Sequence, residues 1–361
     1  MFINHMINKH IFREKAMKKV AIVGCGGIAG VHAVALQKIP DVEMVSFVDI
    51  RRDRAERFSL QYTAGQASVY ENITDMFANE KLDVIHICTP HYLHVPMAIM
   101  ALNNGVSFFS EKPPAINMEQ YNELCEAYKC ALDVSTEYDC KSYEKNQKLC
   151  AGFCFQNRYN ETIRKTDSIL ATGTLGQITG ARAFVNWRRD EAYYQTDWKG
   201  KLSTEGGGAL INQSIHTLDL MLRYLGEPKE VKASLSNHHL QGVIEVEDTV
   251  DAWMTFNDGK RACFYATTAY VSDAPVILEL QCEHGSITMI NKDLIVTTNG
   301  TSEVLHVEEN AGPGKDYWGN GHLSCIKDYY EKMDSGEPFM NDLDGVRNTM
   351  ETMMRIYEYR G

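Results

Sequence analysis

The sequence lacks the features of a membrane protein, a disulfide-rich protein or a nucleic-acid-binding protein. No stretch approaches the roughly 20 consecutive apolar residues that a membrane-spanning helix needs. Its 10 cysteines among 361 residues are too few for a disulfide framework. Positive charge is in deficit, with 36 Lys+Arg against 48 Asp+Glu, and a net charge of −12 disfavours contact with nucleic-acid phosphates. We therefore expect a cytoplasmic protein with reduced thiols and no membrane or nucleic-acid partner. No His, Cys or Asp set has metal-ligand spacing, so we predict no metal site.

Length and composition predict two globular domains behind a short tail. The chain exceeds one ordinary core, and 44% hydrophobic with 23% charged residues is a globular balance. The first 17 residues lack the apolar core and the cleavage site of a secretory signal. We divide the chain into a tail at 1–17, a first domain at 18–155 and a second at 156–361. The polar stretch 132–148 is expected to be a surface excursion.

Strands and helices alternate through the first domain. Apolar runs typical of buried parallel strands occupy residues 19–23, 42–48, 84–88, 106–109 and 149–155. Helical patterns lie between them at 27–39, 51–62, 95–103 and 118–131. This alternation predicts an α/β domain with a doubly wound parallel sheet of the Rossmann type.

The second domain has a different order of elements, typical of an α+β fold. Helical patterns at 159–171 and 209–225 flank a β-type run at 178–187. Further β-type runs follow at 231–235, 249–256, 262–268, 276–282 and 286–290. Asp258-Gly259 between two of these runs predicts a hairpin.

The segment GCGGIAG at residues 24–30 has the arrangement of a dinucleotide-binding turn. Gly24 allows the tight turn, Gly26 lets the backbone approach a pyrophosphate, and Ala29 permits close helix–sheet packing. The amides at the start of the following helix then face the phosphates. The expected cofactor contacts here are Gly24, Gly26, Gly27, Ile28 and Ala29.

The end of the next strand bears on the choice between NAD and NADP. Asp49 lies about twenty residues beyond the turn, where a carboxylate accepts both ribose hydroxyls and repels a 2′-phosphate. Arg51 follows closely and offers a partner for that phosphate. The sequence favours NAD and leaves NADP open.

A series of later motifs resembles the Gfo/Idh/MocA oxidoreductases, the family named for glucose–fructose oxidoreductase and inositol dehydrogenase. The resemblance covers roughly residues 18–361. Its motifs are residues 23–32, 88–94, 111–113, 157–160, 205–208, 212–219 and 317–322. It implies that the second domain is a large, open, mainly antiparallel sheet with helices on one face. It also implies a homodimer or homotetramer formed through that sheet.

The resemblance implies a catalytic Lys112 and His216. Lys112 ends a predicted strand, where an ammonium stabilises a developing alkoxide, and histidine exchanges protons near neutral pH. Asn212 shares a predicted helix face with His216, but many family members carry Asp there, and an amide brings no charge. Asp219 is a candidate to orient the imidazole. The sequence leaves open whether Lys112 carries more of the acid/base work.

The same resemblance implies further contacts with cofactor and substrate. The cofactor set adds Thr89, Pro90, His91, His94, Glu111 and Lys112. The substrate set is Lys112, Arg158, Tyr159, Trp198, Asn212, His216 and His322. Tyr193 is an alternative aromatic group for stacking on a sugar ring.

These features predict an NAD(P)-dependent enzyme that moves a hydride to or from a sugar, a sugar derivative or a cyclitol. Two alternatives stay open. One is a redox-neutral glycoside-cleaving enzyme that retains NAD, and the other is a non-catalytic sensor of the cofactor. Lys112 and His216 together argue against the sensor, because a sensor has no chemical use for both.

Overall fold

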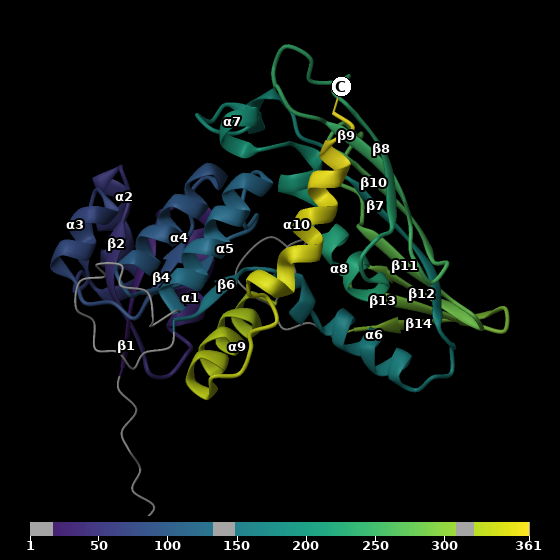
Figure 1. Ribbon diagram of the computed structural model, residues 1–361, viewed down its shortest axis with the longest axis horizontal. Helices are drawn as coiled ribbons and strands as arrows, with labels where there is room; N and C mark the ends of the chain where they lie inside the picture. The colour runs from purple at the N-terminus through teal and green to yellow at the C-terminus, as the bar shows by residue number, and fades with distance from the viewer. Residues whose placement is uncertain (1–16, 133–148, 308–320, 361) are drawn as a thin grey trace, which may run out of the picture.

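The computed structural model describes residues 17–132, 149–307 and 321–360. The tail before Met17, the polar stretch from 133 to 148, and residues 317–320 of the last family motif lie outside the described residues. Within them, two β-sheets lie side by side with helices between and around them (Figure 1).

The first sheet is parallel and has the strand order β3-β2-β1-β4-β5-β6. In chain order its strands are β1 (Lys18–Val23), β2 (Val42–Val48), β3 (Ser68–Tyr70), β4 (Val84–Ile87), β5 (Ser107–Ser110) and β6 (Ala151–Phe153). The helices that connect them are α1 (Gly27–Leu36), α2 (Arg52–Thr63), α3 (Ile73–Asn79), α4 (His94–Asn103) and α5 (Met118–Leu132). This is the doubly wound order in which the chain switches direction between β1 and β4, the place where such sheets bind ligands. The predicted Rossmann-type sheet is confirmed, and β3 and α3 are additions to it.

The second sheet has eight strands in the order β14-β13-β12-β11-β7-β10-β9-β8. Its strands are β7 (Ile178–Asn186), β8 (Glu230–Ser236), β9 (Thr249–Thr255), β10 (Arg261–Thr267), β11 (Ile277–Cys282), β12 (Gly285–Ile290), β13 (Asp293–Thr298) and β14 (Thr301–His306). Neighbours are antiparallel except β7 and β10, so the expected mainly antiparallel sheet is confirmed. The Asp258-Gly259 hairpin joins β9 to β10, with Gly259 at φ +88°. The strands β13 and β14 were not expected.

Helices cover the face of the second sheet that is turned toward the first sheet (Figure 1). They are α6 (Glu161–Ala171), α8 (Ile215–Leu225) and α10 (Leu343–Tyr357). The helix α10 begins where the Asp342 side chain accepts a hydrogen bond from the Gly345 N–H at 2.8 Å. Its buried residues recur every three or four positions and pack into the main core, as for Val346, Met350 and Met353.

The helix α9 (His322–Ser335) comes late in the chain but packs on the first sheet. Tyr329 donates to the backbone oxygens of Phe108 and Cys150 at 3.0 and 3.1 Å. Gly152 in β6 gives the ring room, because a Cβ there would lie 2.6 Å from it. The two halves of the chain are therefore interleaved, and the boundary at 155/156 stays a prediction.

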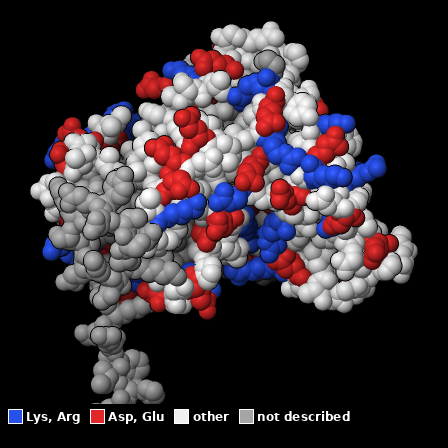
Figure 2. Space-filling model, viewed as in Figure 1, with Lys and Arg blue, Asp and Glu red and all other residues white. Residues whose placement is uncertain are grey.

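Two features bear on the surroundings of the protein. Within the described residues, no helix has the length and apolar character needed to cross a membrane. On the face shown in Figure 2, basic and acidic side chains are interspersed.

Candidate active site

The glycine turn between β1 and α1 leaves open space at the helix start. Gly24 has φ +90°, and a Cβ there would lie 2.7 Å from the backbone oxygen of Cys88. A Cβ on Gly26 or Gly27 would meet nothing within 4 Å. No described side chain caps α1 at Gly26. The turn thus has both the room and the helix-end amides that a phosphate group needs.

Asp49 follows β2 and is held against this turn. Its Oδ2 accepts a hydrogen bond from the Cys25 N–H at 2.8 Å, and its Oδ1 accepts one from the Arg51 N–H at 2.9 Å. Each oxygen keeps a lone pair for a further donor. The Arg51 guanidinium instead contacts Asp53, at 3.1 and 3.3 Å.

The segment after β4 begins with a polar atom that has no partner. Thr89 Oγ1 is buried and makes no hydrogen bond within the described residues. Pro90 then leads into a short 3-10 turn at His91–Leu93. An unpaired buried hydroxyl costs about 1–3 kcal/mol, so a ligand that reaches Thr89 gains by binding it.

Two buried histidines in this segment bind backbone carbonyls. His94 lies between the oxygens of Pro113 (2.8 Å from Nδ1) and Thr89 (2.9 Å from Nε2), and the single N–H of a neutral ring donates to one of them. The ring fastens the two loops together, and the expected contact of His94 with the cofactor stays a prediction. His91 Nδ1 donates to the Glu205 backbone oxygen at 2.9 Å, and its ring lies 4.8 Å from the Trp198 ring. Burial lowers the pKa of both histidines.

Glu111 points away from the expected cofactor position and into the first sheet. Its Oε1 lies 2.9 Å from His32 Nε2, and His32 Nδ1 lies 2.9 Å from His86 Nδ1. Burial alone would raise the pKa of Glu111, but the hydrogen bond from His32 and the charges of His32, His322 and Lys112 together outweigh burial and lower it. Cys154 lies close enough to complete a three-ligand metal set with His32 and Glu111. In this structure the two His32 nitrogens are hydrogen-bonded, to His86 and to Glu111. Glu111 Oε1 is paired inside the sheet, and the expected cofactor contact of Glu111 stays a prediction.

Lys112 lies two residues after β5 and links the two halves of the chain. Its Nζ donates to the backbone oxygen of Asn212 at 2.7 Å. Burial lowers the pKa of Lys112, while the charges of Glu111 and Glu205 oppose that effect. The structure thus brings Lys112 together with Asn212, as the sequence predicted.

The helix expected over 209–225 is not uniform. It opens with a π-helical turn, Ala209–Ser214, and continues as α8. Asn212 lies in the π-helical turn and His216 in the first turn of α8, so an α-helical spacing of four does not relate them. Such turns are frequent at functional sites.

His216 is buried with an unsatisfied ring nitrogen. Its Nδ1 has no hydrogen-bond partner within the described residues, and its ring packs edge-on against Phe155 at 5.7 Å. Burial first, and the charge of Lys112 second, lower the pKa of His216 to about 3. The imidazole is therefore neutral at pH 7 and presents an unpaired nitrogen.

The glycine run before the π-helical turn is required by close packing. A Cβ on Gly207 would lie 1.9 Å from Tyr357 Oη, and one on Gly208 would lie 2.0 Å from the backbone oxygen of Glu247. Glu247 also accepts hydrogen bonds from the Gly208 and Leu210 N–H groups, both at 3.0 Å. Glu247 thus caps the turn, a role that no sequence signal announced.

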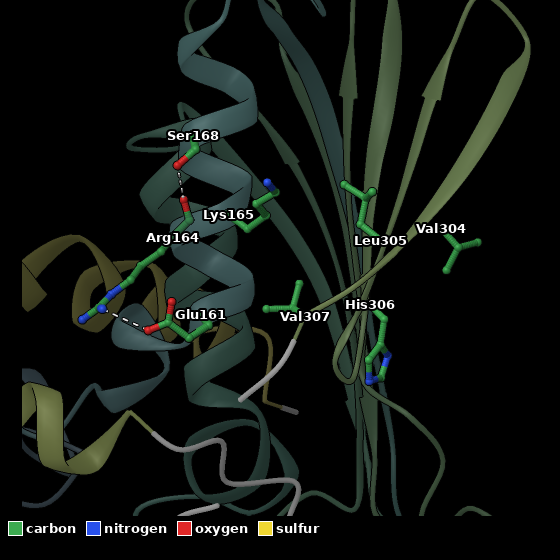
Figure 3. A pocket seen from close by; sticks show the side chains of 8 residues that line it. All are labelled: Glu161, Arg164, Lys165, Ser168, Val304, Leu305, His306 and Val307. Carbon is green, nitrogen blue, oxygen red and sulfur yellow. Dashed lines mark hydrogen bonds and ion pairs between the residues drawn. The ribbon is translucent and has the colours of Figure 1, made fainter. Parts of the chain in front are cut away.

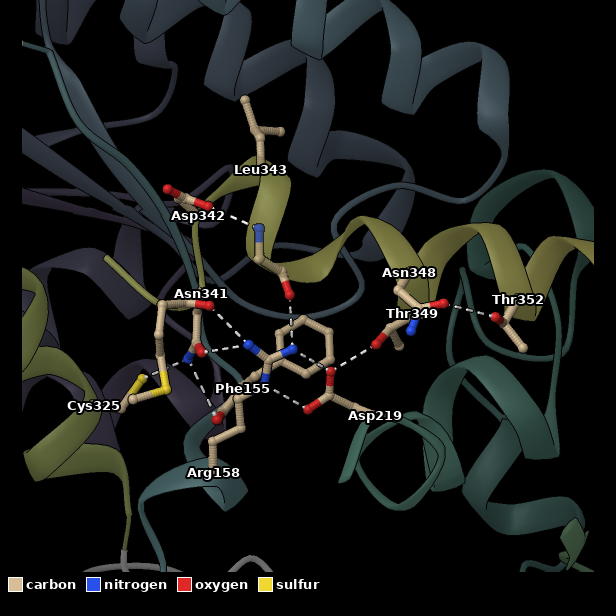
Figure 4. Close-up of polar contacts among 12 residues, drawn as sticks. Phe155, Arg158, Asp219, Cys325, Asn341, Asp342, Leu343, Asn348, Thr349 and Thr352 are labelled. Carbon is tan, nitrogen blue, oxygen red and sulfur yellow. Dashed lines mark hydrogen bonds and ion pairs between the residues drawn. The ribbon is translucent and has the colours of Figure 1, made fainter. Parts of the chain in front are cut away.

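Arg158 and Asp219 bind each other and not the predicted partners (Figure 4). The Arg158 donors reach both Asp219 oxygens, the backbone oxygens of Met340 and Gly345, and Asn341 Oδ1. These five contacts equal the donor hydrogens of a guanidinium, so none is left for substrate. Asp219 accepts a further bond from Thr349 and makes none to His216. These contacts do not support the expectations that Arg158 binds substrate and that Asp219 orients the imidazole, and both stay predictions.

The other residues predicted to contact substrate differ in their surroundings. Tyr159 is buried and donates to Asp328 of α9 at 2.7 Å, which gives it a structural contact. His322 begins α9 and is buried, and burial lowers its pKa to about 4. Trp198 is half-buried beside His91, and Tyr193 lies next to Asn212. The structure therefore keeps Trp198 and Tyr193 near the proposed site.

Two surface pockets lie away from these residues. One of about 550 Å³ lies between α6 and β14 and is lined by Glu161, Arg164, Lys165, Ser168 and residues 304–307 (Figure 3). Another of about 510 Å³ lies between α7 (Leu202–Glu205) and α10. Neither is lined by Lys112 or His216, so we assign neither to the proposed chemistry.

Comparison with known families matches both halves of the chain. Residues 18–135 match the oxidoreductase family with an NAD-binding Rossmann fold. Residues 163–288 match the GFO/IDH/MocA C-terminal domain.

Two named proteins are similar in sequence to part of this chain. D-glucoside 3-dehydrogenase of Escherichia coli (strain K12) is 32% identical over 228 residues, which are 62% of this chain and 58% of that protein. Glucose-6-phosphate 3-dehydrogenase of Bacillus subtilis (strain 168) is 29% identical over 223 residues, 61% of this chain and 57% of that protein. The matches thus span less than two thirds of either relative.

Solved structures share the fold along nearly the whole chain. The WlbA dehydrogenase of Bordetella pertussis, in complex with NADH and UDP-GlcNAcA, has a TM-score of 0.77 at 22% identity, covering 95% of this chain and 96% of that one. An Agrobacterium radiobacter oxidoreductase, in complex with NAD+, L-tartaric acid and magnesium, has a TM-score of 0.81 at 16% identity with the same coverage. At these identities the likeness shows the fold.

Proposed function

This chain belongs to the Gfo/Idh/MocA oxidoreductase family, and from that premise we propose that it transfers a hydride between NAD and a secondary alcohol or ketone of a sugar or cyclitol. The substrate class is supported by the names of its relatives, which are dehydrogenases of a glucoside, of glucose 6-phosphate and of an inositol.

The residues around the glycine turn fit a dinucleotide. The open space beside Gly26 and the uncapped start of α1 suit a pyrophosphate. Asp49 retains acceptor capacity for ribose hydroxyls, and the unpaired Thr89 Oγ1 offers a further contact. We propose NAD over NADP because Arg51 is held by Asp53. When bound, the nicotinamide supplies the site that accepts or donates the hydride.

The proposal rests on the hydrogen bond between Lys112 and the π-helical turn Ala209–Ser214, which directly precedes α8 and His216. The Lys112 Nζ is fixed by Asn212 at 2.7 Å, and its charge contributes to the lowered pKa of His216, so the two groups interact. An ammonium beside the reacting oxygen stabilises an alkoxide, and we assign the acceptance of the hydroxyl proton to His216, whose buried Nδ1 has no partner within the described residues. Because His216 is neutral, it begins the oxidation in the form that a base needs.

Three aspects of organisation are proposals of the same kind. We place the domain boundary after Phe155, between β6 and the short 3-10 turn at Gln156–Tyr159. We expect copies of the chain to meet through the outer face of the second sheet, where Trp253 on β9 is 62% exposed. We assign the protein to the cytoplasm, which agrees with the free thiols of its described cysteines.

The test offers the protein NAD or NADP with a panel of glucosides, hexose phosphates, aminosugars and inositols. We expect reduced-nicotinamide absorbance to rise with at least one member. Lys112→Met should lower kcat/KM about 10³-fold while NAD binding persists. Lys129→Met is the matched control, because Lys129 is exposed on α5 and bonds Glu126.

Free sugar released without net reduction of NAD would instead indicate the glycoside-cleaving enzyme. Tight cofactor binding with no turnover of any kind would indicate the sensor.

A further inference from the structure

A buried carboxylate to which the sequence analysis gave no role beyond membership of the 205–208 motif lies beside the proposed catalytic groups. Glu205 ends α7 and is fully buried. Its Oε1 accepts a hydrogen bond from Asn212 Nδ2, and its Oε2 accepts one from the Gly200 N–H. Its backbone oxygen accepts the bond from His91 described above. Glu205 therefore contacts the π-helical turn, the loop before α7 and the segment after β4.

These contacts fix the orientation of the Asn212 amide. An ionised carboxylate only accepts hydrogen bonds, so it selects the NH₂ end of the amide. The same Nδ2 lies 3.5 Å from Tyr193 Oη, which also accepts from Gln213 Nε2 at 2.8 Å. Both hydrogens of Nδ2 thus point to protein acceptors. Asn212 Oδ1 has no hydrogen-bond partner within the described residues, so the amide is left with an acceptor to offer.

Glu205 also supplies charge where the amide has none. The Asn212 backbone oxygen holds Lys112 Nζ, while its side chain bonds Glu205, so one residue bridges the cation and the anion. The charge of Glu205 opposes the effect of burial on the pKa of Lys112. Where the family pattern has Asp at 212, this chain has its carboxylate one hydrogen bond further away.

We propose that Glu205 is a positioning residue of this site: it turns the Asn212 amide so that Oδ1 accepts the hydrogen of a substrate hydroxyl, and it provides the negative charge that keeps Lys112 an ammonium. The inference rests on the proposed dehydrogenase function.

The positioning role requires an ionised Glu205, so the activity that depends on this role should change with pH. Burial raises the pKa of Glu205 to about 7, although the bonds from Gly200 and Asn212 act to lower it. A protonated Glu205 carries no charge to support Lys112. The expected kcat/KM therefore falls as the pH falls through about 7. The titratable groups that face Glu205 from the surrounding elements are Lys112, Lys199, Glu247, Tyr193, Tyr194 and His91.

The variant Glu205→Gln tests the amide orientation directly. A glutamine has one acceptor and one NH₂ group, but the two groups facing it, Gly200 N–H and Asn212 Nδ2, are both donors. Because the backbone N–H is fixed, the NH₂ of the introduced glutamine has to face Asn212. Asn212 then has to turn its oxygen toward residue 205 and its NH₂ toward the substrate. The site loses its acceptor and its charge together.

A second substitution should restore both. In the double variant Glu205→Gln/Asn212→Asp, one oxygen of the new carboxylate accepts from the NH₂ of the introduced glutamine, and the other faces the substrate. The charge returns beside Lys112, now on residue 212. Asn212→Asp alone places two carboxylates against each other, so one of them takes up a proton.

The experiment compares kcat/KM and its pH profile for wild type, both single variants and the double variant, on whichever substrate the panel identifies. We expect Glu205→Gln to lose about 10- to 100-fold in kcat/KM and to lose the acid limb near pH 7. The double variant should recover most of that loss. Glu279→Gln is the matched control, because Glu279 lies on β11 and pairs with Arg182, away from this site.

Two further measurements keep the outcomes distinct. Thermal unfolding and NAD affinity show whether each variant folds and binds cofactor without reference to turnover. An active wild type with a Glu205→Gln variant of unchanged kcat/KM would overturn the positioning role and leave the dehydrogenase assignment intact. A folded double variant that recovers nothing would overturn the amide orientation. A wild type without dehydrogenase turnover would instead reject the proposed function itself.

Discussion

Arg158 and Asp219 form a buried ion pair that joins the start of the second half of the chain to α8. The guanidinium Nε and Nη2 donate to the two carboxylate oxygens at 2.8 and 2.6 Å, and both side chains are less than a tenth exposed. Arg158 also bonds the backbone oxygens of Met340, before α10, and of Gly345, in its first turn, so the pair holds three parts of the chain together (Figure 4).

Breaking this pair should destabilise the protein without altering substrate recognition. Arg158→Leu leaves the Asp219 carboxylate buried and unpaired, so we expect a loss of about 3–5 kcal/mol in the free energy of unfolding. The double variant Arg158→Leu/Asp219→Leu should lose less, because no lone charge remains. Urea unfolding measures both effects. If Arg158→Leu instead kept its stability and raised KM, Arg158 would be a substrate ligand after all.

Two substitutions in the glycine turn should distinguish an effect on cofactor binding from an effect on folding. A Cβ on Gly26 meets nothing within 4 Å, so Gly26→Ala should fold with an almost unchanged melting temperature. The added methyl occupies space proposed for the pyrophosphate, and NAD affinity should fall about 10-fold or more. Gly24→Ala is the contrasting variant, because its Cβ meets Cys88 and its φ is +90°, so it should lower stability. Calorimetry of folding and of NAD binding checks both. Unchanged NAD affinity in Gly26→Ala would place the cofactor elsewhere.

Much of this architecture could be predicted from local patterns. The strands β4 and β5 inside the first sheet are short and buried at every residue. Thr89 and Lys112 follow the carboxyl ends of these two strands. Because parallel strands end at the same edge of a sheet, recognising the strands was enough to predict that the two residues lie near one another. The elements that escaped prediction lack such patterns. β3 has only three residues, and β14 (TSEVLH) is an exposed edge strand with little apolar character.

The details of the site depended on contacts that no local pattern encodes. Glu205 and Glu247 act through side-chain bonds to the π-helical turn, and Glu247 reaches it from 39 positions beyond Gly208. Arg158 looked like a substrate ligand because it begins the second domain, but its partner Asp219 is 61 residues away. Helical periodicity also assumes an α-helical rise, so it could not anticipate the π-helical turn around Asn212.

Cofactor preference should follow the two aspartates that surround Arg51. Asp49→Ser removes the repulsion of a 2′-phosphate, and Asp53→Ala releases the guanidinium that Asp53 now holds. The freed Arg51 gains a 2′-phosphate partner only where Asp49 no longer repels that phosphate, so the double variant should move the NADP-to-NAD ratio of affinities roughly 100-fold toward NADP. Titration of both cofactors measures the ratio. Asp53→Ala alone should improve NADP binding only slightly, because Asp49 remains. No change in the double variant would show that residue 51 does not reach the ribose.

His216 should make the protein lose stability as the pH falls. Its pKa is about 3 in the folded state against an ordinary value of 6.5, so between these values the unfolded chain binds the extra proton. Folding stability is then fully retained above pH 6.5 and declines below it, by up to about 1.4 kcal/mol per pH unit from this one group. His216→Gln removes that titration, so its free energy of unfolding should decline less steeply than the wild type's between pH 6.5 and 4. His284→Gln, at an exposed position, serves as control and should follow the wild type. Parallel curves for wild type and His216→Gln would mean that folding does not lower the pKa of His216.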